Sequence, residues 1–373
     1  MVGPGMSAVS QETDPGLGLD VRQIVIVGQS LGKGGLGSPA LTPSVSSLFA
    51  SKEVGPYGVL SRATAHDDAQ RPALTMLDSL QSADPDSVWV ESTHSAADTA
   101  YVAIKKGTTQ FATAMARVQF GADAASRMGL HHEVVSVHFI HGEKDHFVGT
   151  TRAQYAADLA EWIGDYRTDV YAITGQVPVG VVCQTSSWDK YVAFPETTLA
   201  ALDVHRDVAD MYCVGPKYHL PYVADGIHLT AAGYFLLGEY HARVVEQVVL
   251  DAGEWEPVAP SSITRVGTSV VVQFTVPTGP LVVDTSTLDA VPNHGFSWHD
   301  DTGSTEVESV EVTGSDEVTV ALASVPTGAN PRLGYGVTNR GGNLRDSAAE
   351  TSVLDGRNLW NWCCHFFDPV PFP

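Results

Sequence analysis

The stretch that decides the fold is Ile24-Val25-Ile26-Val27-Gly28-Gln29-Ser30. Four consecutive apolar β-branched residues predict a strand buried on both faces, as in a parallel sheet covered by helices. The strand ends at Gly28, and Ser30 follows where the chain must turn. Reactive groups collect at the carboxyl ends of strands in open α/β sheets. Two interpretations of Ser30 are therefore open, a nucleophile or a residue that caps a glycine-rich turn. A phosphate-binding loop does not fit, because the segment has neither the G-x-G-x-x-G nor the Walker spacing.

Strand-like and helix-like segments alternate as far as residue 253. Strands are expected at 24–27, 87–91, 134–140, 179–184 and 211–214, and helices at 73–80, 108–128, 152–164, 197–210 and 230–253. The polar residues 39–70 are expected to run over the mouth of the sheet. Alternation at this spacing predicts the α/β class, a parallel sheet with helices on both faces in three layers.

The pattern changes at the proline-containing segment 255–260. Beyond it, strand-like runs occur at 269–276, 281–284, 307–312, 318–322 and 333–337, with turn signals between them and no helical periodicity. These runs predict an antiparallel β-sandwich of the jelly-roll type. We therefore expect an N-terminal extension (1–20), an α/β domain (21–255) and a β-sandwich domain (256–373).

Composition and charge exclude several classes of function. The 373 residues include 43 acidic and 21 basic ones, a net charge of −22. Such a surface repels nucleic acid and anionic membranes, so we expect neither as a partner. No apolar run approaches the ~20 residues that span a bilayer, so no membrane insertion is expected. Residues 1–20 show no basic and apolar signal-peptide pattern.

Neither the cysteines nor the histidines predict a metal site. The cysteines have neither metal-binding spacing nor a disulfide framework; they are Cys183, Cys213, Cys363 and Cys364. Five histidines cluster in the sequence, but no two have the helical spacing that zinc sites favour; they are His131, His132, His138, His141 and His146. We expect no metal and no cofactor.

The decisive chemical segment is Asp225-Gly226-Ile227-His228, directly before the last α/β helix. In this turn a carboxylate can hold an imidazole in one tautomer while the other ring nitrogen faces a nucleophile. Alone, the pattern is also typical of a solvated loop carboxylate beside a capping histidine. Combined with Ser30 at the first strand, it predicts a serine, aspartate and histidine at one edge of the sheet.

These segments resemble a known family. Gly28-Gln29-Ser30, His141-Gly142-Glu143-Lys144-Asp145 and Asp225-Gly226-Ile227-His228 are similar to the nucleophile, third and last blocks of the SGNH (GDSL-like) hydrolases. The nearest branch is that of the sialate O-acetylesterases and carbohydrate acetylesterases of bacteria and phage tails. The resemblance extends from residue 21 to residue 365, and further segments that carry it are 105–109, 216–222 and 343–346.

The resemblance implies roles for individual residues. Ser30 is the expected nucleophile, His228 the general base and acid, and Asp225 its orienting carboxylate. Around the oxyanion and the substrate the expected residues are Gln29, Asp98, His141, Gly142 and Glu143, with the imidazole of His141 as a donor.

The second family block departs from the expected pattern. It falls on 95–99, where the resemblance predicts glycines and the chain has Ala97 and Asp98. A backbone N–H survives such a replacement only where φ is negative, which puts the second oxyanion donor in doubt. We expect the Asp98 carboxylate to point outward, away from the developing oxyanion.

The resemblance implies a serine esterase that removes acetyl groups from a carbohydrate through an acetyl-enzyme. One alternative is a glycan-binding or virion structural protein with weakened catalysis, and another is an esterase for other short-chain esters. The expected partner is an acetylated carbohydrate, and a homo-oligomer or a place in a phage virion is left open. The resemblance favours an extracellular or virion-associated location.

Overall fold

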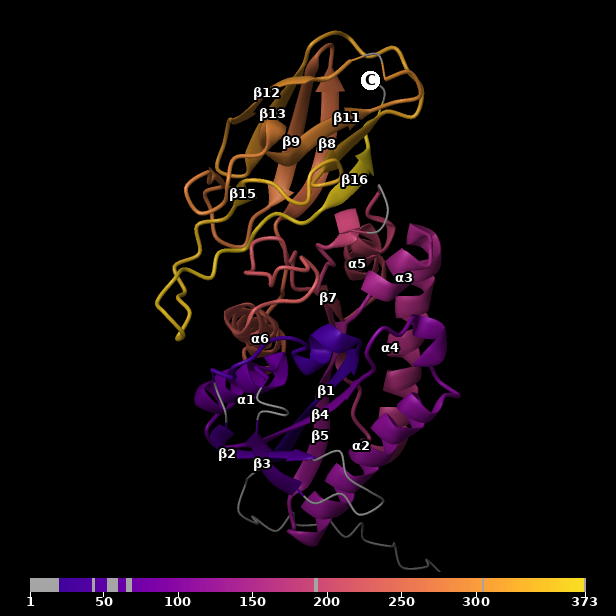
Figure 1. Ribbon diagram of the computed structural model, residues 1–373, viewed down its shortest axis with the longest axis vertical. Coiled ribbons are helices and arrows are strands. Elements are labelled where there is room, and N and C mark those ends of the chain that lie inside the picture. The colour runs from indigo at the N-terminus through magenta and orange to yellow at the C-terminus, as the bar shows by residue number, and fades with distance from the viewer. Residues whose placement is uncertain are drawn as a thin grey trace, which may run out of the picture.

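The computed structural model describes residues 20–41, 44–51, 60–64, 69–190, 194–303 and 305–371. Almost all of the expected N-terminal extension lies outside them. An α/β part occupies one end of the elongated molecule, and a β-rich part occupies the other (Figure 1). The predicted α/β class, with a β-rich C-terminal part, is confirmed.

One seven-stranded sheet runs through the α/β part, in the order β3-β2-β4-β1-β5-β6-β7. Its strands are β1 (Asp20–Gly28), β2 (Ser44–Ser51), β3 (Leu60–Thr64), β4 (Val88–Ser95), β5 (His131–Ile140), β6 (Val179–Val182) and β7 (Met211–Cys213). All neighbours are parallel except β2 and β3. The five expected strands are present. Residues 39–70 were expected to run over the mouth of the sheet. For the residues of this range that the structure describes the expectation was wrong, because β2 and β3 extend the sheet beyond β4.

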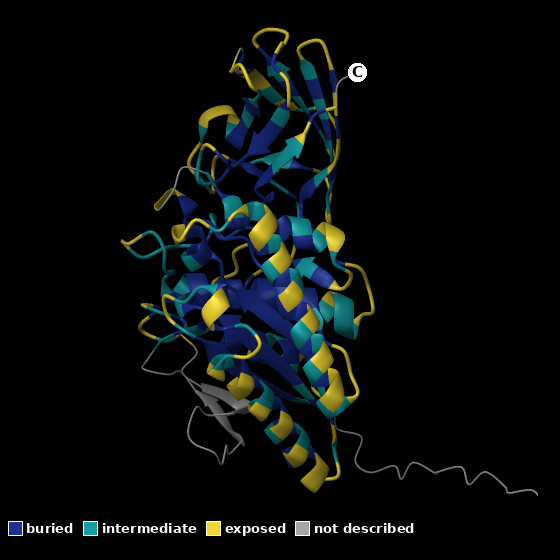
Figure 2. Ribbon diagram, turned by 90° about the vertical axis from the view of Figure 1, so that its right-hand side faces the viewer, coloured by how far each residue is buried: buried dark blue, intermediate teal, exposed yellow. Residues whose placement is uncertain are grey.

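Helices cover both faces of this sheet. The helices are α1 (Pro72–Ala83), α2 (Thr109–Arg127), α3 (Glu143–Phe147), α4 (Arg152–Thr174), α5 (Glu196–Asp207) and α6 (Ala231–Val245), which a π-helical turn, Glu246–Leu250, continues. Ile24 and Ile26 of β1 lie in one core with α1 and α6, whereas Val25 and Val27 lie in the other with α2, α4 and α5. The central strands are buried and the helices expose their outer faces (Figure 2). This two-sided burial is what the apolar run of β1 predicts.

Helix α4 is longer than the sequence suggested. The predicted end at Gly164 was wrong, because the helix runs to Thr174 and ends at Gly175, whose φ is +73°. The apolar side continues beyond Gly164 with Tyr166 and Val170, both fully buried. A glycine in the open middle of a helix costs only ~1 kcal/mol relative to alanine, so burial of that side decides the length.

The β-rich part consists of antiparallel sheets whose inner faces share one apolar core. A four-stranded sheet has the order β12-β13-β9-β8, a three-stranded sheet the order β11-β14-β16, and β10 pairs with β15. The strands are β8 (Ala259–Val266), β9 (Ser269–Thr275), β10 (Val282–Val283), β11 (Phe296–His299), β12 (Val307–Val312), β13 (Glu317–Leu322), β14 (Arg332–Tyr335), β15 (Leu344–Arg345) and β16 (Phe366–Pro369). Phe274 of β9 meets Phe366 of β16 across the core, with ring centroids 6.2 Å apart. Strands β8, β11 and β15 were not predicted. Pro260 and two serines interrupt the alternation of β8, whereas β11 alternates but has only four residues, and β15 has two.

The two parts are joined by buried polar contacts. The Gln184 amide donates to the backbone carbonyl of His365 at 2.9 Å and accepts from the backbone N–H of His365 at 2.8 Å. Arg206 of α5 pairs with Asp368 of β16 at 2.9 Å. The C-terminal segment is thereby fixed against the carboxyl ends of β6 and β7.

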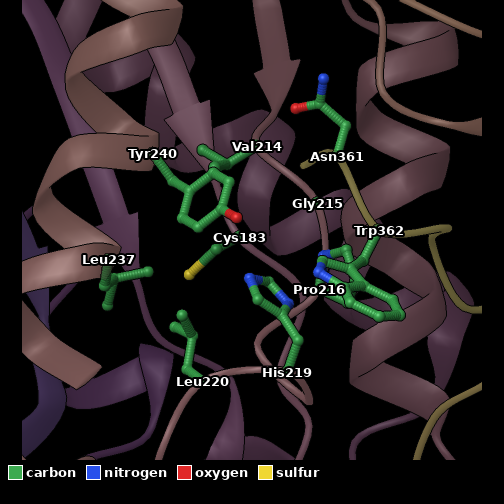
Figure 3. A pocket seen from close by; sticks show the side chains of 10 residues that line it. All are labelled: Cys183, Val214, Gly215, Pro216, His219, Leu220, Leu237, Tyr240, Asn361 and Trp362. Carbon is green, nitrogen blue, oxygen red and sulfur yellow. The ribbon is translucent and has the colours of Figure 1, made fainter. Parts of the chain in front are cut away.

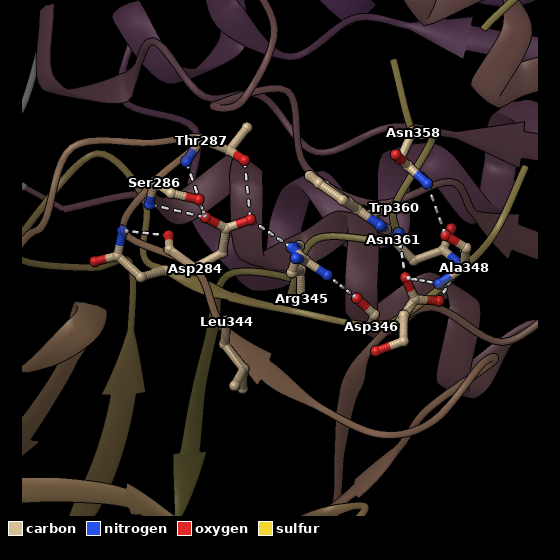
Figure 4. A network of polar contacts seen from close by, with 12 residues as sticks. Asp284, Ser286, Thr287, Leu344, Arg345, Asp346, Ala348, Asn358, Trp360 and Asn361 are labelled. Atoms are coloured by element: carbon tan, nitrogen blue, oxygen red, sulfur yellow. Dashed lines mark hydrogen bonds and ion pairs between the residues drawn. The ribbon is translucent and has the colours of Figure 1, made fainter. Parts of the chain in front are cut away.

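The segment Asn343–Asp346, which contributed to the family resemblance, has a structural role (Figure 4). Arg345 donates to Asp284 at 2.7 Å, and its guanidinium lies 3.5 Å from the centre of the Trp360 ring. Asp346 accepts from the backbone N–H of Asn361 at 2.8 Å. These contacts secure the aromatic C-terminal segment, so this block supports the fold.

Candidate functional site

The nucleophile candidate lies directly after β1. Gly28 ends the strand with a φ of +139°, and a Cβ there would lie 2.1 Å from the carbonyl oxygen of Ile140 on the neighbouring strand. Only glycine fits this close approach. Ser30 then begins a short 3₁₀ turn, Ser30–Lys33. The sharp turn places the serine hydroxyl at the carboxyl edge of the sheet, where ligands of open α/β sheets bind.

Asp225 and His228 lie in a tight loop before α6. The backbone of Tyr222 bridges to that of Leu229, which closes the base of the loop. Asp225 Oδ1 accepts from the backbone N–H groups of Ile227 and His228, at 2.8 and 2.9 Å. The predicted carboxylate is therefore oriented by the turn itself.

The structure brings the three predicted triad residues together. Ser30 Oγ lies 2.8 Å from His228 Nε2, and His228 Nδ1 lies 2.7 Å from Asp225 Oδ2. Partial burial alone would raise the pKa of Asp225, but hydrogen bonds from the His228 ring and from two backbone N–H groups lower it. An ionised Asp225 fixes the tautomer in which Nδ1 carries the proton and Nε2 accepts from the serine.

The triad opens into a pocket of about 390 Å³. The pocket is lined by Gln29, Ser30, Asp98, Glu143, Lys144, Phe147, Ile227 and His228. Five of the eight predicted site residues therefore border it, and the other three, Asp225, His141 and Gly142, do not. Lys144 and Phe147 were not predicted as site residues, although Lys144 lies within the third family block and Phe147 lies two residues after it, so the position of the block could have indicated them.

Gln29 and Glu143 border the pocket with buried side chains. Gln29 Oε1 accepts from the backbone N–H of Lys144 at 3.2 Å, which ties the nucleophile turn to α3. Glu143 pairs with Lys217 at 2.7 Å, and their side chains are 3% and 1% exposed. Burial alone would raise the pKa of Glu143, but the ammonium of Lys217 holds it below its usual value. Lys217 belongs to a segment that carried the family resemblance, but its partner could not be identified from the sequence.

Gly142 is a turn residue outside the pocket lining. Its φ is +124°, and a Cβ would lie 2.9 Å from the Thr185 side chain. Its carbonyl accepts from the Thr197 hydroxyl at 3.1 Å. Gly142 thus turns the chain from β5 into α3 and so places Glu143 and Lys144 at the pocket.

The expectation that the His141 imidazole donates to the oxyanion was wrong. His141 Nε2 lies 2.8 Å from the carbonyl oxygen of Thr99, and Nδ1 lies 2.9 Å from the Tyr155 hydroxyl. A carbonyl only accepts, so Nε2 carries the proton and Nδ1 accepts from Tyr155. Burial lowers the pKa of His141, which keeps the ring neutral. His141 instead donates to the Thr99 carbonyl and so supports the loop that contains the second family block, residues 95–99.

Asp98 takes the backbone conformation of the glycine it replaces. Its φ is +52°, so the negative φ on which the second oxyanion donor was made to depend is not observed. Aspartate is one of the few residues that enter this region readily. The side chain is 82% exposed and pairs with Lys144 at 2.9 Å, so it points outward as expected.

Two backbone N–H groups remain as candidate oxyanion donors. Those of Ser30 and Asp98 belong to residues that line the pocket, and neither donates a hydrogen bond within the described part of the chain. Preorganised backbone donors of this kind stabilise the charge that develops when a serine attacks an ester carbonyl. The site therefore contains a serine within hydrogen-bond reach of a histidine, a carboxylate that orients this histidine, and two candidate oxyanion donors.

No metal centre is indicated in the described ranges. There, no three histidine, cysteine, aspartate or glutamate side chains are grouped so that they could hold a metal ion. His138 lies in the core, 3.0 Å from the ring of His241 and 2.8 Å from the Ser136 hydroxyl. None of the helices described is both long and apolar enough to cross a membrane.

A second hollow lies where α6 meets the C-terminal segment (Figure 3). His219 stacks on Trp362 there, with ring planes at 18°, and Tyr240 and Cys183 close other sides. Its volume is about 10 Å³, which is room for one water molecule. No predicted site residue lines it, and the open pocket beside Ser30 is the better candidate.

A solved structure shares this architecture over most of the chain, and others are similar to the α/β part at lower scores. A carbohydrate acetylesterase from Xanthomonas citri matches 94% of this chain and 80% of its own, with 14% identity and a TM-score of 0.63. A protein of Arabidopsis thaliana matches 60% of this chain and 96% of its own, with 16% identity and a TM-score of 0.48. A GDSL-like lipase from Parabacteroides merdae matches 61% and 98%, with 11% identity and a TM-score of 0.36. No protein-family model and no curated protein matches the sequence.

Proposed function

We propose that this chain, which has the SGNH hydrolase fold, is a serine esterase that removes acetyl groups from hydroxyls of a carbohydrate. The observation that carries the proposal is the unbroken chain of contacts in an open pocket. Ser30 Oγ lies 2.8 Å from His228 Nε2, and His228 Nδ1 lies 2.7 Å from Asp225. This is the arrangement that activates a serine hydroxyl for attack on an ester.

The reaction follows from these contacts in two steps. His228 accepts the Ser30 proton while Oγ attacks the ester carbonyl, and the backbone N–H groups of Ser30 and Asp98 receive the oxyanion. The protonated His228 then donates to the departing sugar oxygen, which leaves an acetyl group on Ser30. Water, deprotonated by the same histidine, attacks this acetyl-enzyme and releases acetate. Asp225 keeps its proton-free form throughout and holds the imidazolium in place.

Two observations support a carbohydrate as the alcohol part. Among the described residues, the pocket lining has two apolar side chains, Phe147 and Ile227, which offer little to a long acyl or alkyl chain. The fold is shared with a carbohydrate acetylesterase over both parts of the chain. At 14% identity this likeness concerns the fold, so the carbohydrate substrate is our proposal.

The charges at the pocket favour a neutral substrate. Of the described residues that line the pocket, Lys144 carries the positive charge, and Asp98 already pairs with it at 2.9 Å. The net charge of −22 adds a field that opposes polyanions at low salt. We therefore propose a neutral acetylated saccharide as the preferred substrate over an O-acetylated sialic acid.

The rival proposal is a glycan-binding or virion structural protein with weakened catalysis. It is favoured by one observation, the engagement of both His141 ring nitrogens by Thr99 and Tyr155, which removes a side-chain donor from the oxyanion region. The intact triad favours the enzyme.

The test compares acetate release from a neutral acetylated oligosaccharide, an O-acetylated sialoside and an alkyl acetate by the purified chain and Ser30→Ala. We expect release that depends on Ser30, with the neutral saccharide turned over fastest at low salt. A preference for the alkyl acetate contradicts the carbohydrate assignment, and a preference for the sialoside contradicts the charge argument. Saccharide binding without release in either protein supports the rival.

A further inference from the structure

The loop that carries Asp225 and His228 is held at its tip by a side chain from the β-rich part. The guanidinium of Arg340 donates from Nη2 to the carbonyl of Gly226, and from Nε to the carbonyl of Ser186. Its flat face lies 4.2 Å from the centre of the Tyr222 ring. Three contacts from one planar group fix its position on the α/β part.

The loop that presents Arg340 is itself tightly packed. It connects β14 to β15, and its glycines lie where no side chain would fit. A Cβ on Gly341 would lie 2.5 Å from the Tyr218 ring, and one on Gly342 would lie 2.3 Å from the Tyr335 ring. The Tyr218 hydroxyl in turn donates to the carbonyl of Cys363 at 2.9 Å. Arg340 is therefore delivered from a rigid support.

The peptide group between Gly226 and Ile227 connects Arg340 to the triad. Its carbonyl accepts from Arg340, and its N–H donates to Asp225 Oδ1 at 2.8 Å. Asp225 Oδ2 accepts from His228, which contacts Ser30. Hydrogen bonds in such a chain polarise one another, so a cation on the carbonyl strengthens the N–H as a donor to the carboxylate.

We infer that Arg340 is a positioning residue for the catalytic Asp225–His228 pair, and that the β-rich part thereby completes the active site. Arg340 lies outside the pocket lining, so it acts through the Gly226–Ile227 peptide and not on the substrate. The Tyr222–Leu229 bridge and backbone hydrogen bonds from Val223 to His228 and from Gly226 to Val223 close the loop, and Arg340 binds the Gly226 carbonyl at its tip. Without this contact the peptide is free to rotate, and Asp225 loses a donor that orients it.

The inference rests on the proposed esterase function, and its test therefore has two readouts. The variant is Arg340→Met, which keeps the apolar stem on Tyr222 and removes the donors. The matched control is Arg206→Met, which removes the 2.9 Å pair with Asp368 at the same junction, on another element. Turnover of a small acetate ester is measured per active site, beside the rate at which a fluorophosphonate labels Ser30. The labelling rate reports the triad even if no tested ester is turned over.

We expect Arg340→Met to lower kcat and the labelling rate by about 10- to 100-fold with KM within about twofold, because misplaced catalytic groups cost rates of this order. Millimolar guanidinium should restore part of the labelling rate, and equal sodium chloride should not. Arg206→Met should keep both rates. The inference is overturned if Arg340→Met retains both rates, or if both variants lose them equally. Should Arg340→Met not fold, Arg340→Lys, with a single donor group, must still lose several-fold; unchanged rates there overturn the inference as well.

Discussion

Replacement of Lys217 by methionine tests the buried ion pair beneath the pocket. The ammonium lies 2.7 Å from Glu143 Oε1, and the two side chains are 1% and 3% exposed. Glu143 Oε2 is buried and has no hydrogen-bond partner among the described residues. Methionine fills a similar volume with an apolar chain, so the change removes the charge more than the packing.

The expected loss in free energy of unfolding at neutral pH is about 3–5 kcal/mol, the range for breaking one partner out of a buried pair. The cost arises because the remaining carboxylate is neither hydrated nor compensated. Adding Glu143→Gln should recover most of it, since the double variant buries no charge. The two changes are therefore expected to be strongly non-additive.

The loss in free energy of unfolding caused by Lys217→Met should become smaller as the pH falls. In the wild type the lowered pKa of Glu143 gives stability that is present above the unfolded value of about 4.3 and is lost as pH falls below it. Without Lys217, burial raises the pKa of Glu143. Its charged form then destabilises the variant as pH rises through that raised pKa. The gap between wild type and variant should therefore narrow as pH falls from 7 to 4.

Urea unfolding at a series of pH values measures this gap. Lys105→Met is the matched control, because Lys105 lies 2.6 Å from Glu161 but both side chains are partly exposed. The control should leave the free energy of unfolding nearly unchanged, as exposed pairs contribute little. A Lys217→Met variant as stable as this control, or a gap that is the same at pH 7 and 4, would refute the reasoning.

Three further predictions concern the triad, the core and the junction. Ser30→Ala should lower ester hydrolysis by ~10³-fold or more, and Asp225→Asn should be milder because it misorients the base without deleting it; steady-state kinetics of the folded variants decide this. Burial lowers the pKa of His138 to about 3, and that of its neighbour His241 falls as well, so the unfolded chain binds more protons below about pH 6.5. The free energy of unfolding should therefore fall between pH 6.5 and 5, with His138 contributing about 2 kcal/mol of the loss. Urea titrations of the wild type measure this change, and a pH-independent stability would contradict the prediction. Truncation at residue 255 should yield poorly soluble protein, and a soluble, fully active fragment in a solubility and esterase assay would show the β-rich part to be an appended module.

The triad was predictable because two segments could be combined, although the Asp225–His228 turn is a weak pattern when taken alone. Ser30 follows an apolar strand, and Asp225 and His228 share one turn before a well-capped helix. The topology of a parallel sheet then brings both segments to one edge. Residue type and chain order were sufficient for this part of the site.

The surroundings of the triad could not be predicted in the same way. His141 is turned away from the oxyanion because Tyr155 and the Thr99 carbonyl bind its two nitrogens, and neither partner is marked by a sequence pattern. Asp98 has a φ of +52°, a conformation that aspartate tolerates but that no sequence pattern marks at this position. Arg340 lies 114 residues from Gly226, and the contact exists only because the two parts are docked. Such roles depend on tertiary packing, which residue patterns do not record.

The central claim is that Ser30 is an activated nucleophile that carries the acyl group. The most direct measurement is mass spectrometry of the protein quenched in acid during turnover of an activated acetate ester. We predict that the peptide containing Ser30 gains the mass of one acetyl group, and that Ser30→Ala shows no such gain and no turnover. Full turnover in Ser30→Ala, or an acetyl group found on another residue whose loss abolishes turnover, would contradict the serine mechanism.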